Sequence, residues 1–428
     1  MSFKSVSCVV VLAALVVVGC ASERSGSVKV FTGARLIDGL GGPPVDDATI
    51  VVRDGRIEAV GPTGSVAEPR SSDVVDLSGR TVVPGFINTH GHVGATSQAD
   101  SGPGLRSDLL NELQVYARYG ITTVNSLGGE GPEAIALRDE QSFPALDRAR
   151  LYVAGTVVTG DTPEAALQVV DENVRLHVDF IKIRVDDNLG TARKMTPDVY
   201  EPVIDRAHER GLAVASHIFY LEDAKELLRA GTDLVAHSVR DRPVDEEFID
   251  LLEEHDVCYV PTLTREVSTF VYQSTPEYFD DPFFLKEADS SVIRSLSDPA
   301  RQKRIRDSES ARRYEKALEV ALVNLKRVAD GGATIAFGTD TGPFGRFQGY
   351  FEHMEMKLMA DAGLSPMQII VSATGDAARC LGLSELGTIE AGKRADFSVL
   401  SQDPLSDITN SRSIESVWIA GNRVPGRD

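Results

Sequence analysis

The amino-acid sequence predicts an α/β protein: a (β/α)8 TIM barrel that carries a small β-sandwich formed by its N- and C-terminal segments. Three observations support this fold class. Eight short apolar segments alternate with amphipathic helical segments through the middle of the chain, as in a barrel of parallel strands. Both chain ends consist of short β-rich runs broken by turns. No glycine-rich phosphate loop follows the first strand, so a doubly wound open sheet ranks second.

The predicted barrel strands are short apolar runs. Helical periodicity lies between several of them, and Val199, Val203, Ile204 and Ala207 form one such apolar stripe. The strands are expected at residues 82–88, 122–126, 151–155, 180–185, 213–217, 234–237, 258–262 and 335–340.

The chain is expected to divide into a composite β-sandwich and a barrel domain. Residues 28–83 and 384–428 each hold too few strands to bury a sheet face alone, so together they would form the sandwich. Residues 84–383 would form the barrel. One connection within it, residues 263–308, is unusually long and rich in Phe and Tyr. Because loops of this length are commonly functional, we expect a lid or pocket wall; an insertion packed on the outside of the barrel is the alternative.

Residues 1–19 resemble the signal peptide of a bacterial lipoprotein. Lys4 provides a positive charge, residues 9–18 form an apolar run, and a small residue precedes Cys20, the expected lipid acceptor. The apolar run is shorter than the roughly 20 residues that a membrane-spanning helix needs. Residues 20–27 would form a tether. We expect an exported lipoprotein of the bacterial cell envelope, on the periplasmic face of the outer membrane or at the cell surface; a plain secretory signal is the alternative.

Composition limits the partners and the redox chemistry. The chain has 64 acidic and 44 basic residues and a net charge of −20, which repels nucleic-acid phosphates and argues against such a partner. Of the four cysteines, Cys8 would leave with the signal peptide and Cys20 would carry lipid. Cys258 and Cys380 have apolar neighbours, so they are expected to be buried free thiols without a disulfide framework.

The strongest local motif is the segment 84–92, Pro-Gly-Phe-Ile-Asn-Thr-His-Gly-His. Two histidines two residues apart on a strand point to the same face, so His90 and His92 could bind one metal ion. They fall where the first predicted barrel strand runs into its loop, and the active sites of such barrels lie at that rim.

Further polar side chains end other predicted strands. His217 and His237 follow two consecutive strands, and Asp340 ends the last one. Because the carboxyl ends of barrel strands meet at one rim, these three side chains are expected near His90 and His92. The remaining four histidines lie in or beside helical segments and are expected to be surface or packing residues.

Lys182 lies within the apolar strand predicted at residues 180–185. A buried ammonium is costly, and burial together with nearby metal charge lowers the pKa of a lysine. A neutral amine can take up carbon dioxide to form a carbamate, whose two oxygens could bridge two cations. A lysine that extends to solvent, or pairs with Asp186 or Asp187, is the alternative.

Together these motifs resemble those of the amidohydrolase superfamily. The resemblance rests on residues 84–92, on the C-terminal segment 387–396, and on an ordered set of single residues. That set is Lys182, His217, His237 and Asp340. The resemblance covers about residues 28 to 425, and within the superfamily it is strongest to the branch of imidazolonepropionases and Xaa-Pro dipeptidase-like enzymes.

The resemblance implies a metal-bearing barrel with a site of six ligands. His90 and His92 would bind the more buried metal ion together with Asp340. His217 and His237 would bind a second ion, with carboxylated Lys182 as the bridge. One or two Zn²⁺ ions are expected, and the binuclear form is favoured.

Three positions depart from the common pattern of the superfamily. Asn88 stands where many relatives have Asp, Ala236 where Glu is common, and Ser238 where Gly is frequent. These departures leave the expected ligands intact but blur the subfamily and hence the substrate.

The expected activity is metal-dependent hydrolysis of an amide C–N bond in a small substrate such as a dipeptide, an N-acyl amino acid or a cyclic amide. Metal-activated hydroxide would attack, and Asp340 would act as general base and then general acid. A metal ion helped by His217 or His237 would polarise the carbonyl. Lactone or ester hydrolysis at the same site is an alternative, as are a metal-dependent lyase or isomerase and a surface-binding lipoprotein without catalysis.

Four residues that follow predicted strand ends are candidates for binding a substrate carboxylate, because their side chains donate hydrogen bonds. They are Tyr220, Arg240, Arg265 and Arg346. The alternative for each is an ordinary solvated loop residue. The sequence is compatible with a homo-oligomer.

Overall fold

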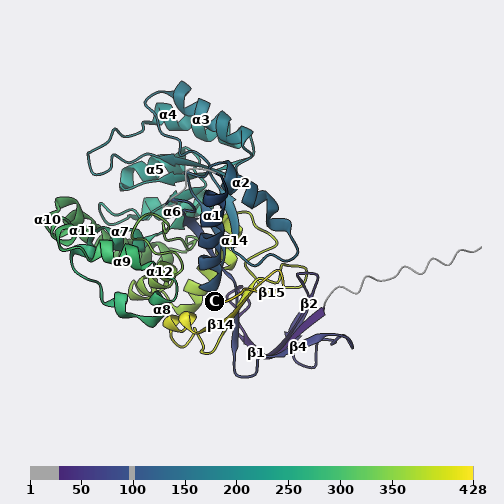
Figure 1. Ribbon diagram of the computed structural model, residues 1–428. Helices are drawn as coiled ribbons and strands as arrows, with labels where there is room; N and C mark the ends of the chain where they lie inside the picture. The colour runs from purple at the N-terminus through teal and green to yellow at the C-terminus, as the bar shows by residue number, and fades with distance from the viewer. Residues whose placement is uncertain (1–27, 96–101, 428) are drawn as a thin grey trace, which may run out of the picture.

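The computed structural model describes residues 28–95 and 102–427. The predicted signal peptide, the lipid acceptor Cys20 and the tether lie outside the described residues. The described chain is α/β, with a strand-rich module beside a larger body of strands and helices (Figure 1). Among the described helices, none combines the length and apolarity needed to cross a membrane.

The two chain ends meet in one eight-stranded sheet. Its order is β15–β14–β13–β5–β1–β2–β3, with β4 paired to β1. β5 and β13 pair antiparallel and so join the N-terminal strands to the C-terminal ones. The strands are β1 (Val28–Leu36), β2 (Val45–Arg53), β3 (Arg56–Pro62), β4 (Asp73–Asp76), β5 (Thr81–Pro84), β13 (Phe397–Leu400), β14 (Ile414–Ile419) and β15 (Asn422–Arg423).

Two parallel sheets form the core of the larger body. One has the order β6–β7–β8 and the other β12–β11–β10–β9. Isolated bridges extend their edges: Val158 pairs with Ile183, Tyr259 with Ile335, and Gly91 with Thr341. The strands are β6 (Phe86–Gly91), β7 (Ile121–Ser126), β8 (Arg150–Val153), β9 (Phe180–Arg184), β10 (Ala213–His217), β11 (Leu234–Ala236) and β12 (Cys258–Val260).

The segment predicted as the eighth strand, residues 335–340, forms no continuous ladder. It is nevertheless held on both sides by backbone hydrogen bonds, from Ala336 N to Tyr259 O at 2.9 Å and from Thr89 N to Phe337 O at 2.9 Å. A left-handed backbone at Asp340, with φ of 60°, ends its extended course, because this conformation turns the chain out of the sheet.

Helices follow most of the parallel strands and cover them (Figure 1). The predicted apolar stripe of residues 199–207 is confirmed, because all four of its members are buried on α4. The α-helices are α1 (Gly102–Arg118), α2 (Pro132–Asp139), α3 (Pro163–Arg175), α4 (Pro197–Glu209), α5 (Leu221–Arg229), α6 (Glu246–Glu254), α7 (Leu263–Phe270), α8 (Pro282–Leu285), α9 (Ser290–Leu296), α10 (Pro299–Asp307), α11 (Glu309–Asp330), α12 (Tyr350–Asp361), α13 (Pro366–Ser372) and α14 (Gly375–Cys380).

The long connection of residues 263–308 is largely helical and contains α7 to α10. Its aromatic residues Tyr272, Phe279, Phe283 and Phe284 are buried in one cluster that includes Phe351 of α12. These rings therefore pack the insertion against the body. The same insertion also lines a cavity of about 660 Å³, to which it contributes Phe284 and, from α9, Ser291, Val292 and Ser295.

The expectation of free thiols at Cys258 and Cys380 was wrong, because the two form a disulfide. It connects β12 to the end of α14 across a sequence separation of 122 residues. The apolar neighbours correctly indicated burial for Cys258, whereas Cys380 is only partly buried. These neighbours carried no information about a partner so distant in the sequence.

Candidate metal centre

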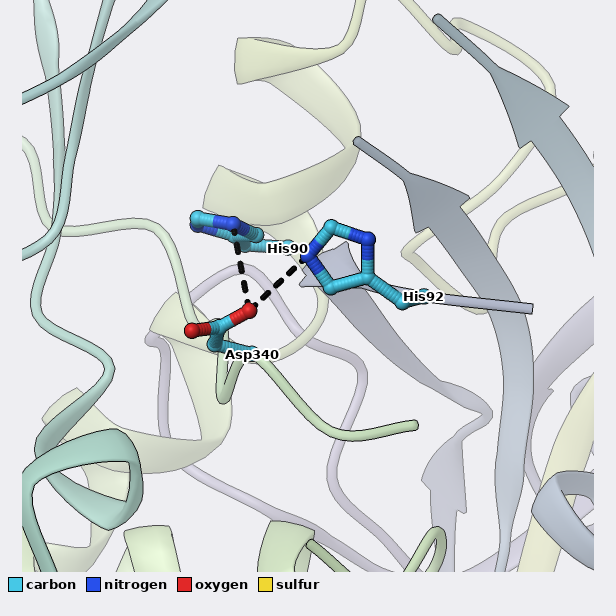
Figure 2. Close-up of side chains that lie close together, drawn as sticks. All are labelled: His90, His92 and Asp340. Atoms are coloured by element: carbon cyan, nitrogen blue, oxygen red, sulfur yellow. Dashed lines mark ion pairs between the residues drawn. The ribbon is translucent and has the colours of Figure 1, made fainter. Parts of the chain in front are cut away.

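Three predicted ligands meet at the end of β6. His90 and His92 come from β6 and the residue after it, and Asp340 is the last residue of the segment 335–340. Both imidazoles face the carboxylate (Figure 2). The Oδ1 atom of Asp340 lies 2.9 Å from His92 Nε2 and 3.7 Å from His90 Nε2. One ligand atom of each residue lies within 4.8 Å of those of the other two. This spacing suits three donors around one ion.

The two carboxylate oxygens of Asp340 face different partners. Oδ1 faces the two imidazoles, whereas Oδ2 accepts a hydrogen bond from Arg346 Nη1 at 2.5 Å. His92 is fixed from its other side, because its Nδ1 lies 3.1 Å from the carbonyl oxygen of Gly128. That contact leaves Nε2 of His92 directed at Asp340, as a second partner of a metal-ligating histidine does.

Lys182 lies in the same cluster. Its side chain on β9 is 3% exposed, and its Nζ lies 3.3 Å from His90 Nε2. Within the described residues it makes no ion pair with Asp186 or Asp187. The predicted alternatives of a solvent-directed or salt-bridged lysine therefore do not describe its position.

His237 and His217 complete the group from β11 and β10. The ring centroid of His237 lies 4.5 Å from that of His90 and 4.3 Å from that of His217. Nδ1 of His237 lies 2.7 Å from the hydroxyl of Thr262, and Nε2 of His217 lies 3.1 Å from Oδ2 of Asp186. The structure thus brings all six side chains together at one end of the parallel strands.

The backbone at this rim is unusual. His237, Thr262 and Asp340 have φ values of 82°, 48° and 60°. Left-handed conformations cost non-glycine residues energy and cluster at functional sites. Each of these three residues lies at or just after the end of a strand or strand-like segment. The turn in the backbone there directs the side chain towards the cluster of six candidate ligands.

Burial sets the protonation states of the cluster. It lowers the pKa of His90 and His237 well below the usual histidine value, and it lowers that of His217 to about 4. Burial also lowers the pKa of Lys182 to about 7. Burial alone would raise the pKa of Asp340, but the Arg346 guanidinium and the hydrogen bond with His92 hold it well below its usual range.

These states fit a divalent cation. Neutral imidazoles and an ionised carboxylate are ligands of Zn²⁺ and similar ions. The buried amine of Lys182 lies beside an imidazole nitrogen, and among the described residues no carboxylate forms an ion pair with it. The residues present therefore fit a metal ion.

The candidate substrate contacts occupy different environments. Arg346 lies against Asp340 and also lines the 660 Å³ cavity. Tyr220 donates a hydrogen bond to Asp187 at 2.8 Å. Arg265 is 9% exposed, pairs with Glu266 at 2.9 Å and lies over the ring of Tyr314.

Arg240 is fully enclosed, with a side chain that is 0% exposed. Its Nη1 donates to the carbonyl oxygens of Ile218 and Ser238 at 2.9 and 2.7 Å, and its Nε lies 3.0 Å from Glu266. Ile218 and Ser238 directly follow two of the clustered histidines in the sequence. Arg240 therefore holds the ends of β10 and β11 in place. This position does not favour the expected direct contact of Arg240 with substrate.

Sequence reasoning missed several residues that support the cluster. Thr262 contacts His237, Asp186 contacts His217, and Glu352 contacts the segments that carry the other ligands. A polar residue at the end of the strand predicted at 258–262 was a usable signal for Thr262. The sequence holds no comparable signal for Glu352, which lies on the helix α12.

The model of the amidohydrolase family matches residues 81–424. That match spans most of the chain, so the protein belongs to the amidohydrolase family. It is therefore a hydrolase of the class that acts on carbon–nitrogen bonds in small molecules, and the cluster around Asp340 is its candidate metal site.

Curated relatives and solved structures agree with this assignment. Imidazolonepropionase of Deinococcus radiodurans is 25% identical over 398 residues, which cover 88% of this chain and 92% of the relative. Ochratoxinase of Aspergillus niger is 23% identical over an alignment that covers 95% of this chain and 88% of the relative. A crystal structure of a Xaa-Pro dipeptidase matches with a TM-score of 0.75 and 24% identity, covering 94% of this chain and all of that one. Molinate hydrolase matches with a TM-score of 0.73 and 23% identity over 93% of this chain and 95% of that one. These structural likenesses show a shared fold.

Proposed function

We propose that this protein is a metal-dependent hydrolase that cleaves the amide C–N bond of a small substrate such as a dipeptide, an N-acyl amino acid or a cyclic amide. The observation that carries the proposal is that four imidazoles, one amine and one carboxylate lie together at one end of the parallel strands. A binding protein without catalysis would have no need for this complete set.

His90, His92 and Asp340 would hold one metal ion, and His217 and His237 a second. Zn²⁺ is the ion favoured by the histidine-rich donor set. Such an ion, when bound, lowers the pKa of water towards about 7 and so provides a nucleophile at neutral pH. Carboxylated Lys182 would bridge the two ions, and its lowered pKa of about 7 supports this because carbamate formation needs the neutral amine.

Asp340 is proposed as the proton carrier. Its low pKa keeps it ionised and able to accept a proton, which it would then return to the leaving nitrogen as general acid. The Arg346 contact at Oδ2 fixes the carboxylate orientation for this transfer. His237, or His217 beside it, would help to polarise the scissile carbonyl, because both rings lie at the mouth.

Arg346 is the strongest of the candidate substrate contacts. It lies beside Asp340, it is 18% exposed, and it borders the 660 Å³ cavity. A guanidinium in this position could bind a substrate carboxylate at the cavity wall. Tyr220 and Arg265 are more remote candidates, because neither of them lines this cavity.

We further propose that β6 to β12 and the segment 335–341 close into a (β/α)8 barrel of residues 84–383, and that the single eight-stranded sheet of the two chain ends folds over on itself as a β-sandwich. The bridges at Val158, Tyr259 and Gly91 support this closure. Export as a lipoprotein, anchored by Cys20 in the cell envelope, is a related proposal. The disulfide supports export, because structural disulfides persist mainly in oxidising compartments.

An activity screen tests the proposal. Protein loaded with Zn²⁺ is assayed against dipeptides, N-acyl amino acids, cyclic imides, lactones and esters, with Asp340→Asn as the control. We expect amide cleavage by the wild-type protein and a loss of roughly 10³-fold or more in kcat for the variant, because proton transfer and orientation both depend on the carboxylate. Full activity in Asp340→Asn, or wild-type protein that binds no metal, would overturn the proposal.

A further inference from the structure

A buried carboxylate on α12 connects the segment that carries His90 and His92 with the segment that carries Asp340. Glu352 is 0% exposed. Its Oε1 accepts hydrogen bonds from Asn88 Nδ2 at 2.7 Å, from the Thr339 hydroxyl at 2.9 Å and from the Thr341 hydroxyl at 2.5 Å. Asn88 precedes His90 by two residues, and the two threonines flank Asp340.

We propose that Glu352 is the positioning residue that sets the spacing of His90, His92 and Asp340 before a metal ion binds. This inference rests on the metal site of the proposed function. A single oxygen receives donors from both ligand segments, so neither segment can shift without breaking one of its hydrogen bonds. Outer hydrogen-bond partners of this kind orient metal ligands.

The network continues from Glu352 to the backbone of the ligands. The side-chain oxygen of Asn88 accepts a hydrogen bond from the amide of His90 at 3.0 Å. The hydroxyls of Thr339 and Thr341 lie 2.9 Å apart, and the amide of His92 donates to the carbonyl oxygen of Thr341 at 2.7 Å. Glu352 is therefore linked to His90 through Asn88, and to Asp340 and His92 through Thr339 and Thr341.

The chemistry of the network explains Asn88. An aspartate there would place a second carboxylate oxygen where Nδ2 now lies, 2.7 Å from Glu352 Oε1. Two carboxylates at this distance repel one another unless they share a proton. The amide of asparagine instead donates to Glu352 while its oxygen still supports His90. The departure from the common family pattern at position 88 is thus matched to the carboxylate on α12.

The same helix offers a matched control. Glu355 lies one turn further along and is also 0% exposed. Its oxygens accept from the amides of Leu263 and Thr264, each at 2.7 Å, and not from the segments that bracket His90 and Asp340. Removing either carboxylate leaves buried hydrogen-bond donors without an acceptor. Of the two glutamates, however, Glu352 contacts Asn88 and Glu355 does not.

The experiment measures metal affinity on the full protein by competition with a chromophoric chelator, using Zn²⁺ and Co²⁺, together with the Co²⁺ absorption spectrum and the melting temperature without metal. We expect Glu352→Leu to weaken metal binding roughly 10- to 100-fold and to alter the Co²⁺ spectrum. Glu352→Gln, which keeps an acceptor, should stay near wild type, and Glu355→Leu should lower the melting temperature without a matching loss of affinity.

A double-mutant cycle keeps the test valid if Glu352→Leu does not fold. Asn88→Asp should weaken metal binding, and Asn88→Asp combined with Glu352→Gln should recover most of the loss, because the new amide can donate to the new carboxylate. Additive effects in this cycle, or equal losses of affinity in Glu352→Leu and Glu355→Leu, would overturn the inference. Wild-type protein that binds neither ion would instead overturn the proposed function on which the inference rests.

Discussion

The disulfide between Cys258 and Cys380 is expected to stabilise the folded protein strongly. It closes a loop with a sequence separation of 122 residues. The chain-entropy relation gives about 5 kcal/mol at 25 °C for a loop of this length, because closure removes conformations from the unfolded chain. The entropy of unfolding is about 2.1 cal/mol/K per residue. For a chain of 428 residues, 5 kcal/mol therefore corresponds to a melting temperature about 6 °C higher.

The comparison uses the wild-type protein and the double variant Cys258→Ala, Cys380→Ala. Calorimetry with and without a thiol reductant should show the lower melting temperature in the variant and in the reduced wild type. The reductant should leave the melting temperature of the variant unchanged, and this control shows that the reductant acts through the disulfide. Cys258 is only 4% exposed, so the reductant is best added during unfolding. Mass spectrometry of a non-reduced digest should recover the two cysteine peptides joined.

An unchanged melting temperature in the double variant would refute the entropic argument. Two separate thiol peptides from protein recovered from the cell envelope would refute the disulfide itself. Because the pair supports the export proposal, the second result would also remove that support. The stability and the redox state are thus tested by separate measurements.

Three further predictions concern single residues. Arg240→Met should destabilise the protein by about 3 kcal/mol in chemical denaturation, because the buried Glu266 loses one of its two arginine partners and two buried carbonyl oxygens lose their donor; a change under 1 kcal/mol, the scale of exposed ion pairs, would contradict the buried-pair argument. For the proposed binuclear site, Lys182→Met should reduce the metal content from two ions to one by elemental analysis, because the variant cannot form the bridging carbamate; an unchanged ratio would show that no bridge forms there. His353 on α12 is buried, and its ring contacts the Ser411 hydroxyl and the carbonyl oxygen of Tyr119. In metal-free protein, the free energy of unfolding should fall as pH falls from about 6.5 towards 4, because burial lowers the pKa of His353 to about 4 and the unfolded chain takes up the proton first. That histidine contributes up to about 3 kcal/mol to the loss. The free energy of unfolding of His353→Gln should therefore fall less steeply with falling pH, and an identical pH dependence would show that His353 does not contribute.

The parts of the fold that local patterns encode could be predicted from the sequence. The alternation of apolar strands and amphipathic helices is a property of neighbouring residues, so β9 and β10 were placed within a residue of their ends. The ligand candidates followed from the same patterns. A histidine that ends a parallel strand lies at the same edge as its counterparts on neighbouring strands, and His90, His217 and His237 do meet there.

The parts that depend on partners distant in sequence could not be predicted. The contact of Glu352 with Asn88 spans 264 residues, and a glutamate on a helix has no local feature that marks it as buried. Arg240 follows a strand end as a substrate contact would, yet its pairing with Glu266 and two carbonyl oxygens turns it inward. Burial and pairing are collective results of packing, which residue type and spacing do not determine.

The strained backbone at the rim shows how stability is exchanged for the geometry of the site. Left-handed conformations at His237, Thr262 and Asp340 each cost of order 1–3 kcal/mol, and they persist only where surrounding contacts enforce them. Those contacts are present: the amide of Asp340 donates to the carbonyl oxygen of His90 at 2.6 Å, and Thr262 contacts the His237 ring. Because the same hydrogen bonds that hold the strained residues also orient the ligands, relaxing the rim would stabilise the backbone locally and disperse the metal site.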